Sequence, residues 1–369
     1  MLKIGITGSN GFIGTHLKNY LSLQKDIIII PFERSDFDNE DKLDDFITEC
    51  NTIIHLAGLN RHQNENVIYD TNVTLAQQLV DACIGTKSAP HIIFSSSTQE
   101  EKGTVYGDSK KRAREILETW ASKYEAMVTS VIIPNVFGPF GKPYYNSVVA
   151  TFCHQLTHDQ QPEIQTDGIV NLIYINTLIK ELLLMIHNPK HGKVILHHEF
   201  SITVSELLKT LQEYKEQYLN HGIFPNLESD LHLSLFNTFR CYVSREHFPV
   251  KYKTHIDERG QFVEISRALT SGQSSYSTTK PGITRGNHFH TRKAERFAVI
   301  KGKARISLRR IDTKEVIDYF LDGNTPAYVD MPIWHTHNIT NIGDDELVTL
   351  FWINEPYNPQ DPDTYFVNV

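Results

Sequence analysis

Four side chains in the last third of the chain have the types and spacing of a metal site. His288 and His290 are two residues apart, so on a β-strand they would point to the same face. Glu295 begins the next strand-like segment and can fold back beside them, and His337 lies in a later one. Three imidazoles and a carboxylate suit Zn²⁺, Fe²⁺, Mn²⁺ or Ni²⁺ and leave positions open for water or substrate. We predict one divalent metal ion here, with Zn²⁺ as the first choice, and His335 as either a fourth ligand or a base.

A tyrosine and a lysine in the first half of the chain could transfer a proton. Tyr106 and Lys110 are four residues apart, and at the start of a helix they would share a face. A lysine ammonium near a phenol lowers the pKa of the phenol, so Tyr106 could exchange a proton with a carbonyl or alcohol near neutral pH. The serine run 95–97 follows the end of a predicted strand and can place a hydroxyl beside that oxygen.

A glycine-rich turn near the N-terminus has the pattern of a dinucleotide site. Gly8, Gly11 and Gly14 lie between an apolar strand and a helical pattern. Such glycines permit a tight turn and a close approach of backbone to pyrophosphate, which then lies at the helix N-terminus. We include Phe12 and Ile13, between the glycines, among the predicted cofactor-binding residues.

The end of the second predicted strand bears on which dinucleotide would bind. An arginine here accommodates the 2′-phosphate of NADP, whereas an acidic residue binds the ribose 2′-hydroxyl of NAD. Arg34 therefore favours NADP as the cofactor, while Glu33 leaves NAD as the alternative.

The elements around these residues indicate two domains. Up to about residue 133, strand and helix patterns alternate, which predicts a parallel sheet covered on both faces, and from about 135 to 240 the pattern is mixed. Beyond residue 245, short β-branched and aromatic segments alternate with turns, which predicts an all-β sandwich or barrel. We therefore expect an α/β domain at 1–245 and a β domain at 246–369. The expected strands are 2–7, 27–31, 52–56, 91–94, 128–133, 261–265, 275–279, 294–300, 303–309, 316–321, 327–329, 337–341 and 347–353, and the helices are 11–23, 67–83, 110–123, 147–157, 176–187 and 203–218.

Composition and charge exclude several classes of protein. The 369 residues include 36 Lys and Arg against 44 Asp and Glu, and the net charge of −8 argues against a nucleic-acid binder. The 4 cysteines are widely spaced while histidines number 18, which favours an imidazole-based metal site in a reducing cytoplasm. The run 27–30 is too short to span a bilayer, and the N-terminal strand leaves no room for a signal peptide, so we expect no membrane partner.

The first 245 residues resemble the extended short-chain dehydrogenase/reductases that act on nucleotide sugars. The resemblance implies that Tyr106 is the proton donor and that Lys110 is its pKa partner and a nicotinamide-ribose ligand. It implies Ser97 as the hydrogen-bond donor to the substrate carbonyl, with Ser96 as the alternative. Only eight residues separate Ser97 from Tyr106, so the loop that closes the pocket in related epimerases is truncated. The resemblance rests on Gly8, Gly11, Gly14, His55-Leu56-Ala57-Gly58, Asn72-Val73-Thr74, Ser95–Ser97, Tyr106–Lys110 and Pro134–Pro139, and it implies cofactor contacts from Leu56, Ala57, Gly58, Lys110 and Pro134.

The β domain resembles the cupin family, with Trp334 where that family has a glycine. This resemblance implies that His288, His290, Glu295 and His337 are the metal ligands. A second resemblance competes for one of them. The stretches 257–264 and 285–288 are similar to metal-free sugar 3,5-epimerases of the cupin class, in which the histidine after Arg-Gly is a base. His288 is therefore either a ligand or a base.

The whole chain resembles bifunctional capsular polysaccharide enzymes in which an extended reductase is fused to a cupin sugar epimerase. The resemblance implies a UDP-linked 4-keto-6-deoxy-N-acetylhexosamine as substrate and a homodimer as assembly. The cupin domain would epimerise C3, and the reductase domain would reduce the C4 ketone with NADPH. The product would be UDP-2-acetamido-2,6-dideoxy-L-talose, a precursor of L-N-acetylfucosamine. The alternatives are a 4-keto sugar reductase with a structural, dimerising cupin and a non-catalytic regulator that senses a dinucleotide.

Overall fold

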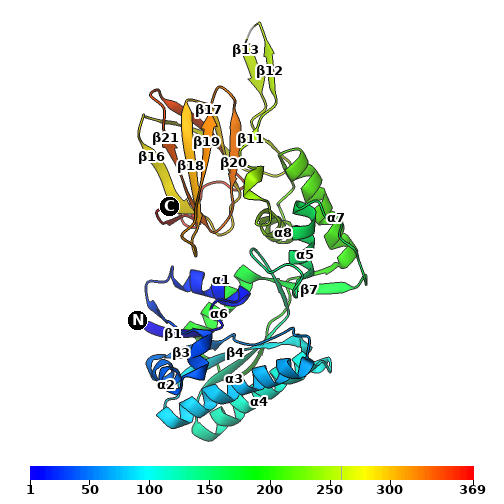
Figure 1. The fold of residues 1–369 in the computed structure, drawn as a ribbon, viewed down its shortest axis with the longest axis vertical. Helices are drawn as coiled ribbons and strands as arrows, with labels where there is room; N and C mark the ends of the chain where they lie inside the picture. The colour runs from blue at the N-terminus through cyan, green and yellow to red at the C-terminus, as the bar shows by residue number, and fades with distance from the viewer. Residues whose placement is uncertain (259) are drawn as a thin grey trace. The chain divides into compact units, whose positions relative to one another are not determined.

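The computed structural model describes residues 1–258 and 260–369, which form two compact units (Figure 1). Arg259, within the stretch that resembles metal-free epimerases, lies outside the described residues. The first unit comprises Met1–Phe137, Gly141–Val148 and Gly168–Thr203, and the second comprises Gly138–Phe140, Val149–Asp167 and Val204–Val369.

The first unit is built on a parallel sheet, which the described residues form in the strand order β2-β1-β3-β4-β5-β8. Its central strands are apolar and buried on both faces, as expected for a parallel sheet covered by helices. The strand order reverses around β1, and such a switch point leaves a crevice at the carboxyl ends of the strands. The strands are β1 (Leu2–Thr7), β2 (Ile27–Ile30), β3 (Thr52–His55), β4 (His91–Ser97), β5 (Val128–Ile133) and β8 (Gly192–Ile195).

Helices cover both faces of this sheet (Figure 1). On one face α3 and α4 pack along each other, and Leu79, Leu117 and Trp120 join the buried core with the strand residues Ile53 and Phe94. On the other face α1 packs against α6. The helices are α1 (Phe12–Leu21), α2 (Glu40–Glu49), α3 (Glu65–Thr86), α4 (Val105–Tyr124) and α6 (Ile175–His187), and a small sheet adds β6 (Asn135–Phe137), β7 (Ile169–Tyr174) and β9 (Phe200–Thr203).

The second unit contains two antiparallel sheets that face each other across an apolar core. Within the described chain their orders are β11-β20-β17-β22-β15 and β19-β18-β21-β16-β23. Phe297, Val299, Ile306, Leu308 and Val329 form part of this core. The strands are β11 (Val250–Lys251), β15 (Gln273–Thr279), β16 (Thr284–Phe289), β17 (Glu295–Lys301), β18 (Lys303–Arg310), β19 (Val316–Asp322), β20 (Ala327–Met331), β21 (His335–Asn341), β22 (Leu347–Ile353) and β23 (Tyr365–Phe366).

The predicted fold class is confirmed: a Rossmann-type parallel domain is followed by an antiparallel all-β domain. The sequence patterns missed α2 and β16. They also missed α8 (Asp230–Arg240), although Ser229 caps it by accepting a hydrogen bond from the backbone N–H of His232. The helix expected at 203–218 ends earlier, as α7 (Val204–Tyr214), and continues as a π-helix, η3 (Lys215–Asn220).

The second unit, called the barrel unit below after its two facing sheets, also includes segments that precede residue 245. The helices α5 (Val148–Thr157), α7 and α8 belong to it. The boundary between residues 245 and 246 stays a prediction about the domains. The remaining short strands of this unit are β10 (Ile223–Phe224), β12 (Thr254–Asp257), β13 (Gly260–Val263) and β14 (Arg267–Ala268).

Two further observations concern the helices and the cysteines. None of the helices in the described part of the chain is long and apolar enough to cross a bilayer. All four cysteines are free, and Cys50, Cys83 and Cys153 are buried.

A buried ion pair links η3 to the barrel. Arg296 on β17 is 2% exposed, and its Nε and Nη2 donate to the carboxylate of Asp330 on β20 at 2.7 and 2.8 Å. The guanidinium stacks over the ring of Tyr328 at 3.7 Å. From η3, the hydroxyl of Tyr218 donates to the same carboxylate at 2.8 Å. The charge of Asp330 therefore has hydrogen-bonded partners on two elements.

We predict that Asp330→Asn destabilises the barrel unit by about 3 kcal/mol, because it leaves the Arg296 cation buried without a counter-ion. The matched control is Glu315→Gln, which breaks an ion pair with Arg245 whose partners are 55% and 69% exposed. That change should cost less than about 1 kcal/mol. Urea unfolding followed by tryptophan fluorescence measures both, and equal losses for the two variants would contradict the prediction.

Candidate active sites

The glycine turn after β1 packs closely against itself and against the backbone of the segment after β3. Gly8 has φ +73°, in the left-handed region, and a Cβ on it would lie 2.8 Å from the backbone nitrogen of Ala57. A Cβ on Gly14 would lie only 2.2 Å from the carbonyl oxygen of Gly8. Neither position can hold a side chain without moving the turn. The turn therefore lies tightly against the segment after β3, at the sheet's switch point.

The N-terminus of α1 is suited to a phosphate. Gly11 is the N-cap and has no side chain to occupy the first backbone N–H groups of the helix. The first turn consists of Phe12, Ile13 and Gly14 and carries no charge. Free N–H groups and the positive end of the helix dipole favour an anion at this end. The predicted residues Gly8, Gly11, Phe12, Ile13 and Gly14 are thus brought together.

A hydrogen-bonded pair aligns β1 with β3 beside this turn. The hydroxyl of Thr7 lies 2.7 Å from Nδ1 of His55 and accepts from the backbone N–H of Ala57 at 3.3 Å. Burial lowers the pKa of His55 to about 3, so this histidine is neutral. His55 therefore supports the crevice and is not an acid or base within it.

Asn72 holds the next part of the crevice in place. Its Oδ1 accepts from the backbone N–H of Leu59 at 2.6 Å, and its Nδ2 donates to the Leu59 carbonyl at 2.9 Å. The same Nδ2 donates to the hydroxyl of Ser109 at 2.8 Å. A Cβ on Gly58 would lie 2.9 Å from Asn72 Oδ1. The segment Leu56-Ala57-Gly58 is thereby connected to α4.

Tyr106 and Lys110 lie in the first turns of α4, as predicted. Thr104 caps this helix by accepting from the backbone N–H of Gly107 at 3.1 Å. Lys110 is 4% exposed, and its Nζ lies 4.5 Å above the ring of Phe94. Burial lowers the pKa of Lys110 to about 8.

The predicted lowering of the tyrosine pKa is wrong for this structure. Burial raises the pKa of Tyr106 to about 12, and the nearby Tyr145 adds to that rise. Desolvation of the phenolate outweighs any attraction to the lysine ammonium. The phenol therefore holds its proton at neutral pH, which is the state that a proton donor needs. Tyr145, in the loop 141–147, is a neighbour of the site that no sequence motif indicated.

The three serines at the end of β4 differ in what their hydroxyls can do. Ser95 donates to the carbonyl of His55 at 3.0 Å, and Ser96 donates to the carboxylate of Glu100. Ser97 is half-buried and accepts from the backbone N–H of Gln99 at 3.2 Å, so its own proton can still be donated. Of the two serines considered for carbonyl binding, this arrangement favours Ser97 over Ser96.

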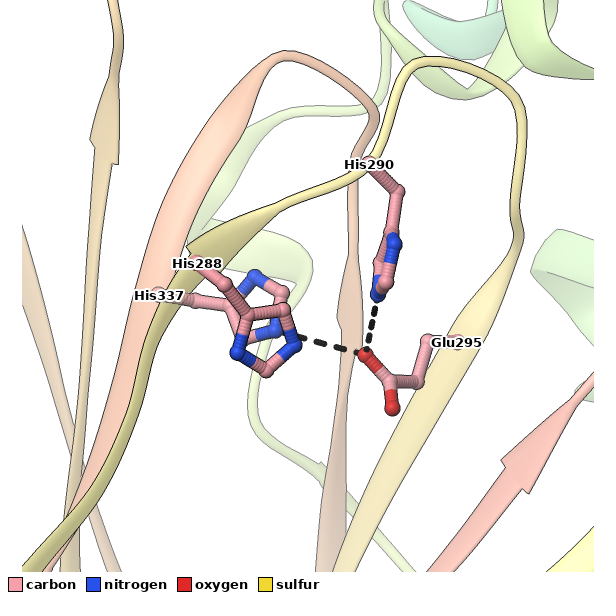
Figure 2. Close-up of side chains that lie close together, drawn as sticks. All are labelled: His288, His290, Glu295 and His337. Atoms are coloured by element: carbon pink, nitrogen blue, oxygen red, sulfur yellow. Dashed lines mark ion pairs between the residues drawn. The ribbon is translucent and has the colours of Figure 1, made fainter. Parts of the chain in front are cut away.

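In the barrel, the four predicted ligands lie together (Figure 2). His288 comes from β16, His290 follows that strand, Glu295 begins β17 and His337 lies on β21. Their ligand atoms all lie within 4.8 Å of one another. Oε2 of Glu295 lies 3.3 Å from Nε2 of His290 and 3.3 Å from Nε2 of His337.

Backbone carbonyls fix the orientation of these imidazoles. Nδ1 of His290 contacts the carbonyl of Asp363, and Nδ1 of His337 contacts the carbonyl of His335 at 3.1 Å. Since a carbonyl only accepts, both Nδ1 atoms carry the hydrogen, and in the neutral ring Nε2 presents its lone pair to the centre of the cluster. This is the tautomer that a metal ligand requires.

The electrostatics of the cluster also fit a cation. Burial opposes the negative charge of Glu295, but the His290 and His337 imidazoles beside it outweigh burial and lower the pKa of the carboxyl. Burial lowers the pKa of His288 to about 4, which keeps that imidazole neutral. In the described chain, Nε2 of His290, Nε2 of His337 and Oε2 of Glu295 are buried without a hydrogen bond. A divalent cation among them would satisfy all three atoms, so the residues present fit a metal ion.

His335 does not join this group. Its Nδ1 contacts the carbonyl of Ile333 at 3.0 Å, and its ring packs 6.0 Å from that of Phe140. Burial lowers its pKa to about 4. Its role as a fourth ligand or base stays a prediction. The neighbouring Trp334 has φ +61°, a left-handed conformation, which gives a physical reason for the glycine that cupins carry there.

The sequence matches two families. Residues 4–197 match the NAD dependent epimerase/dehydratase family, and residues 255–365 match the polysaccharide biosynthesis C-terminal domain. The chain belongs to the NAD dependent epimerase/dehydratase family.

Similar proteins extend the comparison to the whole chain. UDP-2-acetamido-2,6-beta-L-arabino-hexul-4-ose reductase from Pseudomonas aeruginosa is 33% identical over 100% of this chain and 99% of its own length. The crystal structure of capsular polysaccharide assembling protein CapF from Staphylococcus aureus is 32% identical, with a TM-score of 0.65 and full coverage of both chains. The spore coat polysaccharide biosynthesis protein SpsL from Bacillus subtilis is 28% identical over 31% of this chain and 82% of its own.

We predict that Gly14→Ala weakens binding of NADPH and NADH by more than about tenfold, or about 1.4 kcal/mol. The reason is that the new Cβ must displace the Gly8 carbonyl and with it the turn. The matched control is Gly85→Ala in α3, where a Cβ would meet nothing within 4 Å. Fluorescence titration of the reduced dinucleotide measures both, and unchanged binding by Gly14→Ala would show that the turn does not hold the cofactor.

Proposed function

We propose that this protein is a bifunctional nucleotide-sugar enzyme of capsular polysaccharide biosynthesis. Its Rossmann-type domain would reduce the C4 ketone of a UDP-linked 4-keto-6-deoxy-N-acetylhexosamine with NADPH. Its barrel would epimerise C3 of the same sugar, so that the product is UDP-2-acetamido-2,6-dideoxy-L-talose. The observation that carries the proposal is the end-to-end similarity to a UDP-sugar 4-ketone reductase in a chain that also gathers three histidines and a glutamate.

The reduction needs a hydride on C4 and a proton on the C4 oxygen. NADPH supplies the hydride when it is bound. The phenol of Tyr106 holds its proton at neutral pH and would donate it to the oxygen, while Ser97 donates a hydrogen bond to the same atom. The ammonium of Lys110 would stabilise the phenolate that remains. Tyr106 and Ser97 thus act on the C4 oxygen, and Lys110 acts on the Tyr106 oxygen.

The epimerisation needs a base that removes the C3 proton and returns it on the other face of the sugar, and His335 is the candidate for this base. A ketone at C4 acidifies that C–H bond, so epimerisation must precede the reduction that destroys the ketone. Zn²⁺ held by His288, His290, Glu295 and His337 would supply Lewis acidity that stabilises negative charge on the ketone oxygen. This assignment treats His288 as a ligand, in keeping with its place among the three other side chains.

The preference for NADP rests on two neighbouring side chains. The backbone carbonyl of Glu33 accepts from the backbone N–H of Asp36 at 3.0 Å at the start of a 3₁₀ turn, and the Glu33 N–H donates to the Asp36 carboxylate at 2.7 Å. Arg34 is exposed beside it. The Glu33 backbone thus takes part in the turn, and in this proposal the exposed Arg34 guanidinium meets a 2′-phosphate.

Replacing Arg34 tests this preference. Arg34→Ala should weaken NADPH binding by about tenfold or more, because a hydrogen bond to a charged group contributes about 1.5–3 kcal/mol. NADH binding should stay unchanged. Arg112→Ala, which removes another exposed arginine, serves as the control. Equal losses for the two dinucleotides would assign Arg34 to some other contact.

A homodimer in a reducing cytoplasm is also part of the proposal. The hairpin of β12 and β13 exposes Ile256 by 77% and Phe262 by 69%. A two-stranded hairpin with solvent-exposed apolar side chains is marginally stable alone, which supports burial of this hairpin against a second copy of the chain. The buried free thiols support a reducing compartment.

The decisive experiment follows both reactions in one sample. The purified enzyme is incubated with the UDP-4-keto sugar and NADPH in heavy water. Tyr106→Phe should reduce NADPH oxidation by about 10²–10⁴-fold while deuterium still enters C3. A His290→Ala/His337→Ala double variant should lose the deuterium uptake but still reduce a substrate that is already epimerised. Mass spectrometry and absorbance at the NADPH band give the two readouts.

Two outcomes would overturn parts of the proposal. Deuterium uptake that persists in the histidine double variant would leave a reductase whose barrel is structural. No NADPH oxidation by the unaltered enzyme across a panel of UDP-4-keto sugars would favour a regulator that senses a dinucleotide.

A further inference from the structure

The carboxylate of Asp363 binds the loop that follows His290. Its oxygens accept from the backbone N–H groups of Thr291 at 3.0 Å, Arg292 at 3.0 Å and Lys293 at 3.2 Å. The Thr291 hydroxyl donates to it as well, at 2.6 Å. Asp363 is 3% exposed, so these bonds form away from solvent. One buried side chain therefore fixes three consecutive peptide units between two predicted metal ligands.

The backbone of the same residue contacts a ligand directly. The carbonyl oxygen of Asp363 accepts from Nδ1 of His290, the ring whose Nε2 points into the cluster. A carbonyl in this position selects the tautomer and the ring orientation of a metal-binding histidine. The side chain of Asp363 thus anchors the loop, and its main chain orients the ligand.

Asp363 adopts a backbone conformation that needs support. Its φ is +41°, in the left-handed region that residues other than glycine rarely occupy. Such a conformation persists where surrounding contacts determine it, and it is common at functional sites. The hydrogen bonds to 291–293 are contacts of that kind.

Neighbouring contacts attach the rest of this C-terminal segment (355–369) to the same loop and to β16. Nζ of Lys293 donates to the carbonyl of Pro362 at 2.8 Å, and Arg292 pairs with Glu355 at 3.0 Å. Further on, β23 pairs with β16, with Phe366 opposite His288. The segment therefore contacts the surroundings of two of the four ligands.

We propose that Asp363 is a positioning residue of the metal site. Its carboxylate holds the C-terminal segment against 291–293 so that its carbonyl keeps His290 in the ligand tautomer, and metal affinity depends on that carboxylate. The inference rests on the metal site of the proposed function.

The test measures zinc affinity in the full-length protein by competition with a chromogenic chelator. Asp363→Ala removes the carboxylate. Asp363→Gly removes it but also relieves the left-handed backbone, so the pair separates anchoring from strain. Both variants should bind Zn²⁺ about 10–100-fold more weakly, as is typical for loss of an outer-shell partner. Asp363→Asn keeps one acceptor oxygen and should recover part of the loss.

The matched control is Asp361→Asn, two residues away. Asp361 pairs with Arg292 at 2.9 Å, but its side chain is 66% exposed. This variant should bind Zn²⁺ as the unaltered protein does. Substitution with Co²⁺ adds a spectroscopic readout, because its visible absorption bands should shift in Asp363→Ala and not in the control.

The outcomes separate this inference from the proposed function. If the unaltered protein and a His290→Ala variant bind Zn²⁺ equally poorly, the metal site itself is wrong. If the unaltered protein binds tightly and Asp363→Gly matches it in affinity and in the cobalt spectrum, Asp363 has no positioning role. A lower melting temperature of the metal-free variant with unchanged zinc affinity would likewise reduce Asp363 to a structural residue.

Discussion

The buried carboxylate of Glu295 is the constraint around which the barrel is arranged. A carboxylate removed from water is costly unless an opposite charge and hydrogen bonds meet it. Glu295 lies on β17 in one sheet, while His288 and His337 lie opposite each other on β16 and β21 in the other. Shifting either strand by one residue would turn an imidazole to the other face and break up the set of side chains gathered around the charge. Strand register brings the imidazoles beside this charge, and the backbone carbonyls and the C-terminal segment keep them oriented.

The sequence predicted those parts of the sites that depend on local spacing. Tyr106 and Lys110 share a helix face because they are four residues apart. His288 and His290 are close because they are two residues apart, although β16 ends at Phe289 and His290 lies just beyond it. The glycine turn was predictable for a steric reason, since Gly8 and Gly14 have no room for a Cβ. The paired side chains are neighbours in sequence, whereas the backbone that crowds Gly8 belongs to Ala57.

The sequence did not predict contacts between distant segments or the cost of burial. Asp363 meets His290 only because the chain returns to the barrel after β22, and no local pattern indicates that return. The pKa of Tyr106 rises because the phenol is desolvated, and desolvation depends on how α4 packs. The link from Tyr218 to Asp330 joins a π-helix to a strand far along the chain. Spacing identifies candidate residues, whereas packing decides their protonation and partners.

The position of Asp363 in the chain has a consequence for the order in which the protein matures. Every residue of the Rossmann-type unit, up to Thr203, leaves the ribosome before residue 363 does. Since domains made first generally fold first, that unit can form the proposed dinucleotide site while the barrel still lacks the partner of His290. Metal uptake would then be a late event in biosynthesis, and a nascent chain arrested before residue 363 would have a complete dinucleotide turn but an unfinished metal site.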